Sequence, residues 1–238
     1  MTNFCLIHGS AHGPKGWKSL QSELAKYEFT STALELPLDK GDEPIDAYVD
    51  YLEKDLENKD IDISESIILA HSSGCMFLPL IANRLIEKNE KPMGMIFLAG
   101  FVPVSGKSLM NEALNDKTMM NPNWIGKNPM NDEVAIEFQF HDCEEKLLKE
   151  SLSNRVFFFA KKAMENNYPL FNYPKIPIGY ITCTEDRTFT KEWQNRVARE
   201  RLNISPKQIN TGHCPQNCNP SRLAEILNVY AEEMYSKL

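Results

Sequence analysis

The chain has 238 residues, of which 42% are hydrophobic and 25% are charged, and its formal net charge at pH 7 is −7. This composition is typical of a globular protein, and the length suits one domain or one domain with an insertion. The negative net charge and the lack of a basic run argue against a nucleic-acid-binding protein. Met1 is followed almost at once by an apolar run at residues 4–7, without a basic leader or a long apolar segment. The sequence therefore predicts a cytoplasmic protein without a secretory signal or a membrane-spanning segment.

The first hundred residues alternate short apolar runs with amphipathic ones. We expect strands at residues 4–7, 29–36, 67–70 and 95–99. We expect helices at residues 17–24, 45–56 and 74–86, and an acidic loop from Pro37 to Pro44. Strands that alternate with helices in this rhythm predict βαβ units and a mainly parallel sheet.

The alternation stops after residue 100. Residues 101–174 hold methionines, asparagines, prolines and scattered aromatics, with helix-like runs at 132–140, 144–152 and 156–165 and no obvious strand. We expect this segment to be a helical cap over the carboxyl edge of the sheet. Residues 1–100 and 175–238 would then form the core, which resumes with strands at 178–183 and 207–209 and helices at 191–199 and 221–235.

The six cysteines lie at positions 5, 75, 143, 183, 214 and 218, and their spacing does not resemble a disulfide framework. Because no secretory signal is apparent, we expect reduced thiols. His213 with Cys214 and Cys218 is an alternative metal cluster. Zinc sites normally have two matched ligand pairs, however, and the chain offers no second pair, so we predict no metal site.

The stretch at residues 67–75, with the sequence IILAHSSGC, is the most informative motif. A strand that ends in small-x-Ser-x-small predicts a nucleophile elbow, a tight turn that presents a serine hydroxyl above the sheet. Ala70 and Gly74 are the small flanking residues around Ser72, whereas a motif centred on Ser73 would be flanked by larger residues. Ser72 is therefore the candidate nucleophile. The alternative is a buried strand followed by a serine helix cap.

Two further candidates follow Ser72 in the chain order Ser, Asp, His that is expected of such hydrolases. Asp186 and His213 each come shortly after an expected strand. A serine hydroxyl needs a neutral imidazole to take its proton, and the imidazole needs a carboxylate to orient it. Glu185 is an alternative acid. His12 and His71 are alternative bases, but both lie in tight turns.

The remaining site residues are expected around this triad. An oxyanion hole needs two backbone N–H groups, which we assign to Ser73 and to Ser10 in the loop after the first strand. Apolar and aromatic side chains dominate small-molecule pockets, and the cap is rich in both. The candidate substrate-binding residues are Gly9, Met119, Trp124, His141 and Phe158. For any one cap side chain, packing against the core is the more common role.

Five motifs carry a resemblance to a known family. They are residues 8–13 with Trp17 (HGSAHG…W), residues 70–74 (AHSSG), residues 140–143 (FHDC), residues 180–186 (YITCTED) and residues 212–215 (GHCP). They resemble motifs of the α/β-hydrolases that include plant methyl esterases, hydroxynitrile lyases and bacterial serine hydrolases. The resemblance implies an α/β-hydrolase fold whose eight-stranded core is often shortened by its first two strands. It also implies Ser72, Asp186 and His213 as the triad, with Ser10 and Ser73 as oxyanion donors.

We therefore expect a carboxylesterase that hydrolyses a small, largely apolar ester through an acyl-enzyme, without a metal or organic cofactor. The lyases carry a threonine where this chain has Gly9 and a lysine where it has Cys214, and both differences favour an esterase. A triad-based lyase or C–C bond hydrolase is an alternative within enzymes. A non-catalytic small-molecule-binding protein is an alternative of another class, because a fold does not fix a function. The sequence fixes neither the substrate nor the oligomeric state.

Overall fold

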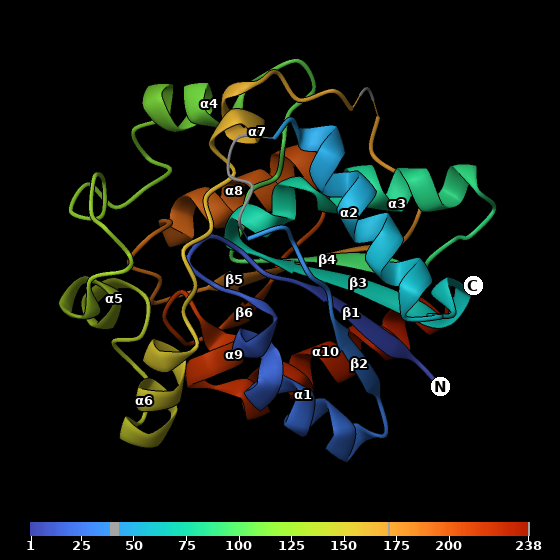
Figure 1. Ribbon diagram of the computed structural model, residues 1–238, viewed down its shortest axis with the longest axis horizontal. Coiled ribbons are helices and arrows are strands. Elements are labelled where there is room, and N and C mark those ends of the chain that lie inside the picture. Colours follow the sequence, from blue (N-terminus) through green and yellow to red (C-terminus); the bar gives the residue numbers. More distant parts are fainter. Residues whose placement is uncertain (39–42, 171, 238) are drawn as a thin grey trace.

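The computed structural model describes residues 1–38, 43–170 and 172–237. Its described strands form one sheet of six in the order β2-β1-β3-β4-β5-β6, and each neighbouring pair is parallel (Figure 1). The strands are β1 (Asn3–Ile7), β2 (Thr30–Ala33), β3 (Ser66–His71), β4 (Gly94–Leu98), β5 (Ile178–Cys183) and β6 (Lys207–Ile209). The predicted parallel sheet is therefore confirmed.

The central strands are apolar over most of their length, as expected for strands that helices cover on both faces of the sheet. Every residue of β3 and β4 is buried. In the register of the sheet, Ile7 lies opposite Ala70 and His71 lies opposite Leu98. The chain segments that follow β1, β3 and β4 therefore leave the sheet at one edge.

Helices α2 (Ile45–Asn58), α3 (Leu78–Glu87) and α8 (Lys191–Leu202) cover one face of the sheet (Figure 1). Helices α1 (Lys18–Leu24) and α10 (Pro220–Tyr235) cover the other face. The core is accordingly divided into two buried clusters, one containing Tyr48 and Trp193 and the other containing Trp17 and Leu227. Burial of each such large apolar side chain contributes roughly 1.5–3 kcal/mol to folding, which makes these clusters the main support of the sheet.

Between β4 and β5 the chain forms α4 (Leu109–Asn115), α5 (Asp132–Phe138), α6 (Glu145–Ser153) and α7 (Lys161–Glu165). Helix α4 was not predicted, and only residues 161–165 of the expected helix at 156–165 are helical. One isolated antiparallel bridge, between Met120 and Phe189, connects this segment to the chain after β5. The division into a core and a cap at residues 101 and 174 stays a prediction.

Two other element boundaries differ from those predicted. Strand β2 ends at Ala33 rather than at residue 36, although Leu34 N–H still donates to Leu6 O at 2.9 Å. The segment after β3 begins as a 3₁₀ helix over Ser72–Met76, and α3 starts at Leu78. Pro79 lies in the first turn of α3, where its missing N–H costs no hydrogen bond. Residues 39–42 of the predicted acidic loop lie outside the described residues.

The expectation of six reduced cysteines is wrong for two of them. Cys143 and Cys218 form a disulfide, whereas Cys5, Cys75, Cys183 and Cys214 are free and buried. The two bonded cysteines are 75 positions apart, and they meet where α6 and the residues before it pack near the short helix α9 (Pro215–Cys218). Spacing along the chain could not predict this pairing. Disulfides are typical of oxidising compartments, so this bond does not support the predicted cytoplasmic location, which stays a prediction.

Within the described ranges, no helix combines the length and the apolar character that a membrane crossing requires.

Candidate active site

Ser72 lies at the tight turn that follows β3. Its φ angle is +54°, in the left-handed region that non-glycine residues rarely occupy. The chain can turn here because neighbouring positions are small. A Cβ atom on Gly74 would lie 2.3 Å from the carbonyl oxygen of His8, and one on Gly100 would lie 2.5 Å from that of Ser72. The turn therefore packs closely against the segments after β1 and β4, and a larger residue at Gly74 or Gly100 would clash.

Three polar side chains from separate loops meet at this turn. Ser72 Oγ lies 3.0 Å from His213 Nε2, and His213 Nδ1 lies 2.8 Å from Asp186 Oδ2. The His213 ring is 3% exposed and the Asp186 side chain is fully buried. Because Nδ1–H donates to the carboxylate, Nε2 is left to accept the hydroxyl proton of Ser72. The structure thus places the predicted serine, histidine and aspartate in one chain of hydrogen bonds.

The carboxylate of Asp186 is held by its own loop and by α8. The backbone N–H of Thr188 donates to Oδ1 at 2.7 Å, and that of Phe189 does so at 3.1 Å. Gln194 Nε2 donates to Oδ2 at 2.9 Å, and Thr188 Oγ1 lies 2.8 Å from His213 Nδ1. Neither Thr188 nor Gln194 was predicted from the sequence as part of the site. A threonine two residues after an aspartate is a turn signal, and it could have indicated the first of them.

The alternative acid and bases do not contact Ser72 Oγ through any hydrogen bond among the described residues. Glu185 is exposed, and its carboxylate contacts Thr184 Oγ1 at 3.4 Å. His71 Nε2 donates to the carbonyl oxygen of His213 at 2.9 Å, so it supports the loop of His213. Burial lowers the pKa of His12 to about 3, aided by the charges of His213, His8 and Arg155. Burial also lowers the pKa of His71 well below its usual range.

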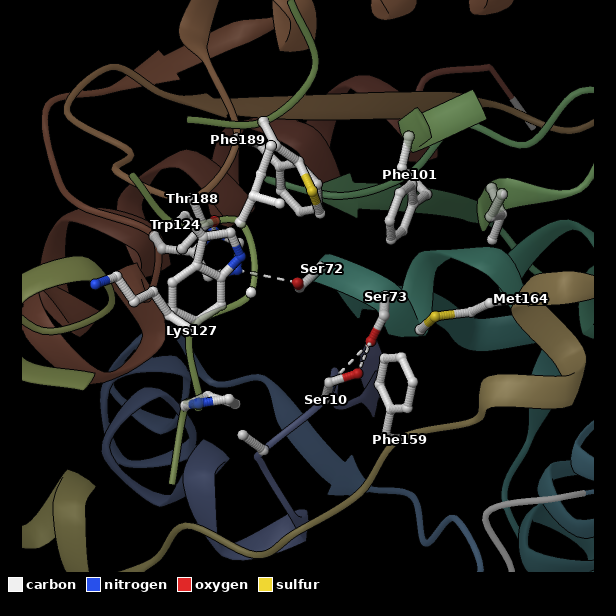
Figure 2. Close-up of a pocket in the computed structure, with 18 of the residues that line it drawn as sticks. Ser10, Ser72, Ser73, Phe101, Trp124, Lys127, Phe159, Met164, Thr188 and Phe189 are labelled. Atoms are coloured by element: carbon white, nitrogen blue, oxygen red, sulfur yellow. Dashed lines mark hydrogen bonds between the residues drawn. The ribbon is translucent and has the colours of Figure 1, made fainter. Parts of the chain in front are cut away.

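The two residues predicted as oxyanion donors lie against each other. Ser10 N–H donates to Ser73 Oγ at 2.7 Å, and the two hydroxyl oxygens are 2.8 Å apart (Figure 2). Both residues line the cavity that also contains Ser72. Ser10 is also anchored from its C-terminal side, because Ala11 N–H donates to Phe158 O at 3.2 Å. The loop after β1 and the turn after β3 therefore form one continuous wall beside the Ser72 hydroxyl.

The cavity above Ser72 has a volume of about 570 Å³. Its apolar wall includes Phe101, Leu109, Met120, Trp124, Phe158 and Phe189. Leu114, Ile125 and Phe157 also line it and are each at least 60% exposed, so the cavity opens to solvent between them. Lys117 and Lys127 line it as well, whereas the described lining residues include no aspartate or glutamate. A space of this size and character fits a largely apolar small molecule.

Of the five predicted substrate-binding residues, two line the cavity and three do not. Trp124 and Phe158 line it. Met119 is buried in the core, and its neighbour Met120 lines the cavity instead. Gly9 packs against the turn, where a Cβ atom would lie 2.9 Å from Ser72 Cβ. His141 is outside the cavity lining, and its Nε2 donates to Glu185 O at 3.0 Å.

Within the described residues, no group of three or more His, Cys, Asp or Glu side chains is placed to hold a metal ion. Cys218 of the alternative metal cluster is bonded to Cys143.

Several solved structures share this fold. Polyneuridine aldehyde esterase has a TM-score of 0.77 at 20% identity, and the match covers 97% of this chain and 99% of that one. A pyrethroid hydrolase from Sphingobium faniae has a TM-score of 0.79 at 19% identity, with 97% of each chain covered. A methylesterase from Arabidopsis, MES16, has a TM-score of 0.74 at 19% identity, with 98% of this chain and 99% of that chain covered. At such identities the likeness shows the fold.

Among curated proteins, no sequence matches this chain. The sequence does match the alpha/beta hydrolase family over residues 6–226. This match spans most of the chain, and it confirms the resemblance on which the predicted fold class was based. The chain belongs to the alpha/beta hydrolase family.

Proposed function

We propose that the protein is a serine carboxylesterase in which Ser72 is the nucleophile, His213 the general base and Asp186 the residue that orients it. One observation carries this proposal. Ser72 Oγ, His213 Nε2 and Nδ1, and Asp186 Oδ2 are joined by contacts of 3.0 and 2.8 Å at the floor of an apolar cavity. A serine hydroxyl paired with an oriented imidazole is the arrangement that acyl transfer requires.

In the first half of the reaction, Ser72 Oγ attacks the ester carbonyl carbon while its proton passes to His213 Nε2. The carbonyl oxygen becomes an oxyanion, which the backbone N–H groups of Ser10 and Ser73 stabilise. When the tetrahedral intermediate collapses, the bond to the alcohol oxygen breaks and the alcohol leaves with the proton from His213. The acyl group then remains on Ser72.

In the second half, His213 removes a proton from a water molecule, which attacks the acyl-enzyme. A second tetrahedral intermediate forms at the same oxyanion position. Its collapse returns the proton to Ser72 Oγ and releases the carboxylic acid. Each step uses the contacts of His213 with Ser72 and Asp186, and none requires a metal or an organic cofactor.

The walls of the cavity support a largely apolar, small-molecule ester as the substrate. A volume of about 570 Å³ lies within the range of small-molecule sites, roughly 300–1,000 Å³. Solved structures with this fold include proteins named as polyneuridine aldehyde esterase, a pyrethroid hydrolase and a methylesterase. Those names support ester hydrolysis as the class of reaction.

A panel of aryl, alkyl and methyl esters, with quantification of both products, tests this function. The proposal predicts equal amounts of acid and alcohol from at least one ester. It also predicts that Ser72→Ala reduces turnover by about 10⁴- to 10⁶-fold. A folded protein that binds apolar acids in the cavity but cleaves none of the esters would favour the non-catalytic alternative. Products of C–C cleavage from carbonyl substrates would favour the other enzymatic alternative.

A further inference from the structure

A short segment of the cap, residues 140–143, lies between the loop of Asp186 and the loop of His213. It follows α5 and precedes α6, and Figure 1 shows α6 beside α9. The two loops already contact each other, because Glu185 N–H donates to Thr211 O at 3.0 Å. The segment therefore contacts the chain next to both candidate catalytic side chains without lining the cavity.

Two consecutive side chains of this segment bind the residues that precede Asp186 and His213. His141 Nε2 donates to the carbonyl oxygen of Glu185 at 3.0 Å. Asp142 Oδ2 accepts the backbone N–H of Gly212 at 2.7 Å. The second contact pairs a carboxylate with a backbone donor, which makes it stronger than a hydrogen bond between neutral groups. Each contact fixes a backbone atom one residue away from a side chain of the triad.

Gly212 leaves room for this segment because it has no side chain. A Cβ atom at this position would lie 2.7 Å from Asp142 Oδ1 and 2.8 Å from His141 Nε2. Both side chains therefore approach the Gly212 backbone more closely than any larger residue would allow. The absence of a side chain at Gly212 is what lets both hydrogen bonds form together.

The segment is anchored on both sides of these two residues. Phe140 is 1% exposed and packs in a buried cluster with Ala135 and Cys214. Cys143 is bonded to Cys218, five residues after His213. The loop of Asp186 has another tie to α5, because Arg187 Nη1 donates to Glu137 O at 3.1 Å. The contacts of His141 and Asp142 thus connect to the two loops a segment that is also held by apolar packing and by the disulfide.

We infer that His141 and Asp142 are positioning residues, which hold the loops of Asp186 and His213 in the register that the Ser72–His213–Asp186 chain requires. This inference rests on the proposed function. Neither side chain touches the cavity, so both act through the backbone at Glu185 and Gly212. A displacement of about 1 Å at a reacting group can cost as much as a hundredfold in rate. Loss of either contact should therefore lower the rate of acylation while substrate binding persists.

The test compares Asp142→Ala with Asp142→Asn, because an amide oxygen can still accept the Gly212 N–H and a methyl group cannot. We expect Asp142→Ala to lower kcat about tenfold with KM within twofold, and Asp142→Asn to keep most of the kcat. Gly212→Ala should match Asp142→Ala, since its Cβ would displace the same carboxylate. The double variant should then be no slower than either single one, as expected for residues that act through one contact. Glu145→Ala is the control, because this exposed cap carboxylate pairs only with Lys149 in the described structure.

Hydrogen exchange at the amides of residues 212–214 provides a readout that does not depend on turnover. The inference predicts faster exchange in Asp142→Ala and wild-type exchange in Asp142→Asn. It is overturned if Asp142→Ala keeps the wild-type kcat and exchange, if Asp142→Asn is as slow as Asp142→Ala, or if KM alone changes. A wild-type protein that cleaves no ester would instead contradict the proposed function, and the exchange data would still decide whether Asp142 fixes the loop.

Discussion

The backbone N–H of Ser10 donates a 2.7 Å hydrogen bond to the hydroxyl of Ser73. If Ser10 N–H is an oxyanion donor, the ester oxygen has to replace Ser73 Oγ as its acceptor. Ser73→Ala removes this competing acceptor and keeps the backbone N–H of residue 73. A typical net hydrogen bond of about 0.5–1.5 kcal/mol then predicts a two- to tenfold rise in kcat/KM.

Steady-state kinetics of Ser73→Ala and Ser10→Ala on one aryl ester measure this effect. Ser10→Ala serves as the comparison because it removes the Ser10 hydroxyl and leaves the N–H in place. A tenfold or larger loss in Ser73→Ala would contradict the prediction, since it would mean that the Ser73 hydroxyl itself stabilises the oxyanion.

Asp186→Asn should preserve the fold and remove most of the activity. The amide can occupy the same place between Thr188, Gln194 and His213, but it carries no charge to stabilise the imidazolium and it disturbs the tautomer of His213. Loss of this carboxylate from a triad costs about 10⁴-fold in kcat in a well-studied protease. We expect a loss of about 10³- to 10⁴-fold with a melting temperature close to that of the wild type. Glu185→Gln is the matched variant, and a comparable loss there would mean that Glu185 is the acid.

The substrate preference should follow the charge of the cavity wall. Lys117 and Lys127 line it and no described lining residue is acidic, so a cationic ester loses hydration without gaining a partner. We predict that 3,3-dimethylbutyl acetate is cleaved with a kcat/KM at least tenfold above that of acetylcholine, its cationic isostere. In the double variant Lys117→Glu/Lys127→Glu, the ratio of the kcat/KM for the neutral ester to that for the cationic ester should fall. An equal or reversed preference in the wild type would contradict the prediction and would indicate cation–π binding to the aromatic wall.

Acid should lower the unfolding free energy of the protein through His8 and His12, two buried histidines of the loop after β1. Burial lowers the pKa of His8 to about 4, with a hydrogen bond to Gly9 O opposing the shift, and that of His12 to about 3. These rings stay neutral in the folded protein at pH 5, whereas in the unfolded chain they bind protons below pH 6.5. Stability is therefore complete above pH 6.5 and falls as the pH drops toward 4, by about 2 kcal/mol for each ring at pH 5.

Urea unfolding at pH 7.5 and pH 5 measures this loss. His12→Gln removes one of these groups, so its unfolding free energy should fall by about 2 kcal/mol less than that of the wild type between the two values. The same pH dependence in both proteins would show that His12 does not contribute.

The disulfide between Cys143 and Cys218 should contribute measurably to stability. It closes a long loop, with a sequence separation of 75. The chain-entropy model gives about 4.5 kcal/mol for such a loop, or roughly 10–15 °C in melting temperature for a chain of this size. Thermal unfolding of Cys143→Ser with Cys218→Ser, compared with the wild type in the absence of reductant, checks this value. Equal melting temperatures would contradict it.

The order of the elements and the candidate triad followed from local patterns. Each of Ser72, Asp186 and His213 comes shortly after a strand, and in a parallel sheet the carboxyl ends of the strands meet at one edge. Short-range patterns carry this information because strand and helix periods are read over a few residues. The same patterns placed β3, β4 and β5 within one or two residues of their observed bounds.

Features that depend on packing between distant segments could not be predicted in the same way. The pairing of Cys143 with Cys218 needs α6 to lie on α9, and the role of Gln194 needs α8 to approach the Asp186 loop. Met119 and Met120 have the same chemistry, but only Met120 lines the cavity, because the local backbone decides which side chain points inward. His141 was predicted to bind substrate, yet it contacts the backbone of Glu185.

The most direct test of the proposed catalytic serine is intact-mass analysis after incubation with a fluorophosphonate, which reacts covalently with an activated serine. The proposed mechanism predicts one adduct per chain, mapped to Ser72, with no adduct in Ser72→Ala and a strongly slowed reaction in His213→Ala. Ser73→Ala should still be labelled, because Ser73 contributes a backbone N–H rather than a nucleophile. An unlabelled wild-type protein that is folded, or an adduct mapped to another residue, would contradict the assignment of Ser72 as the nucleophile.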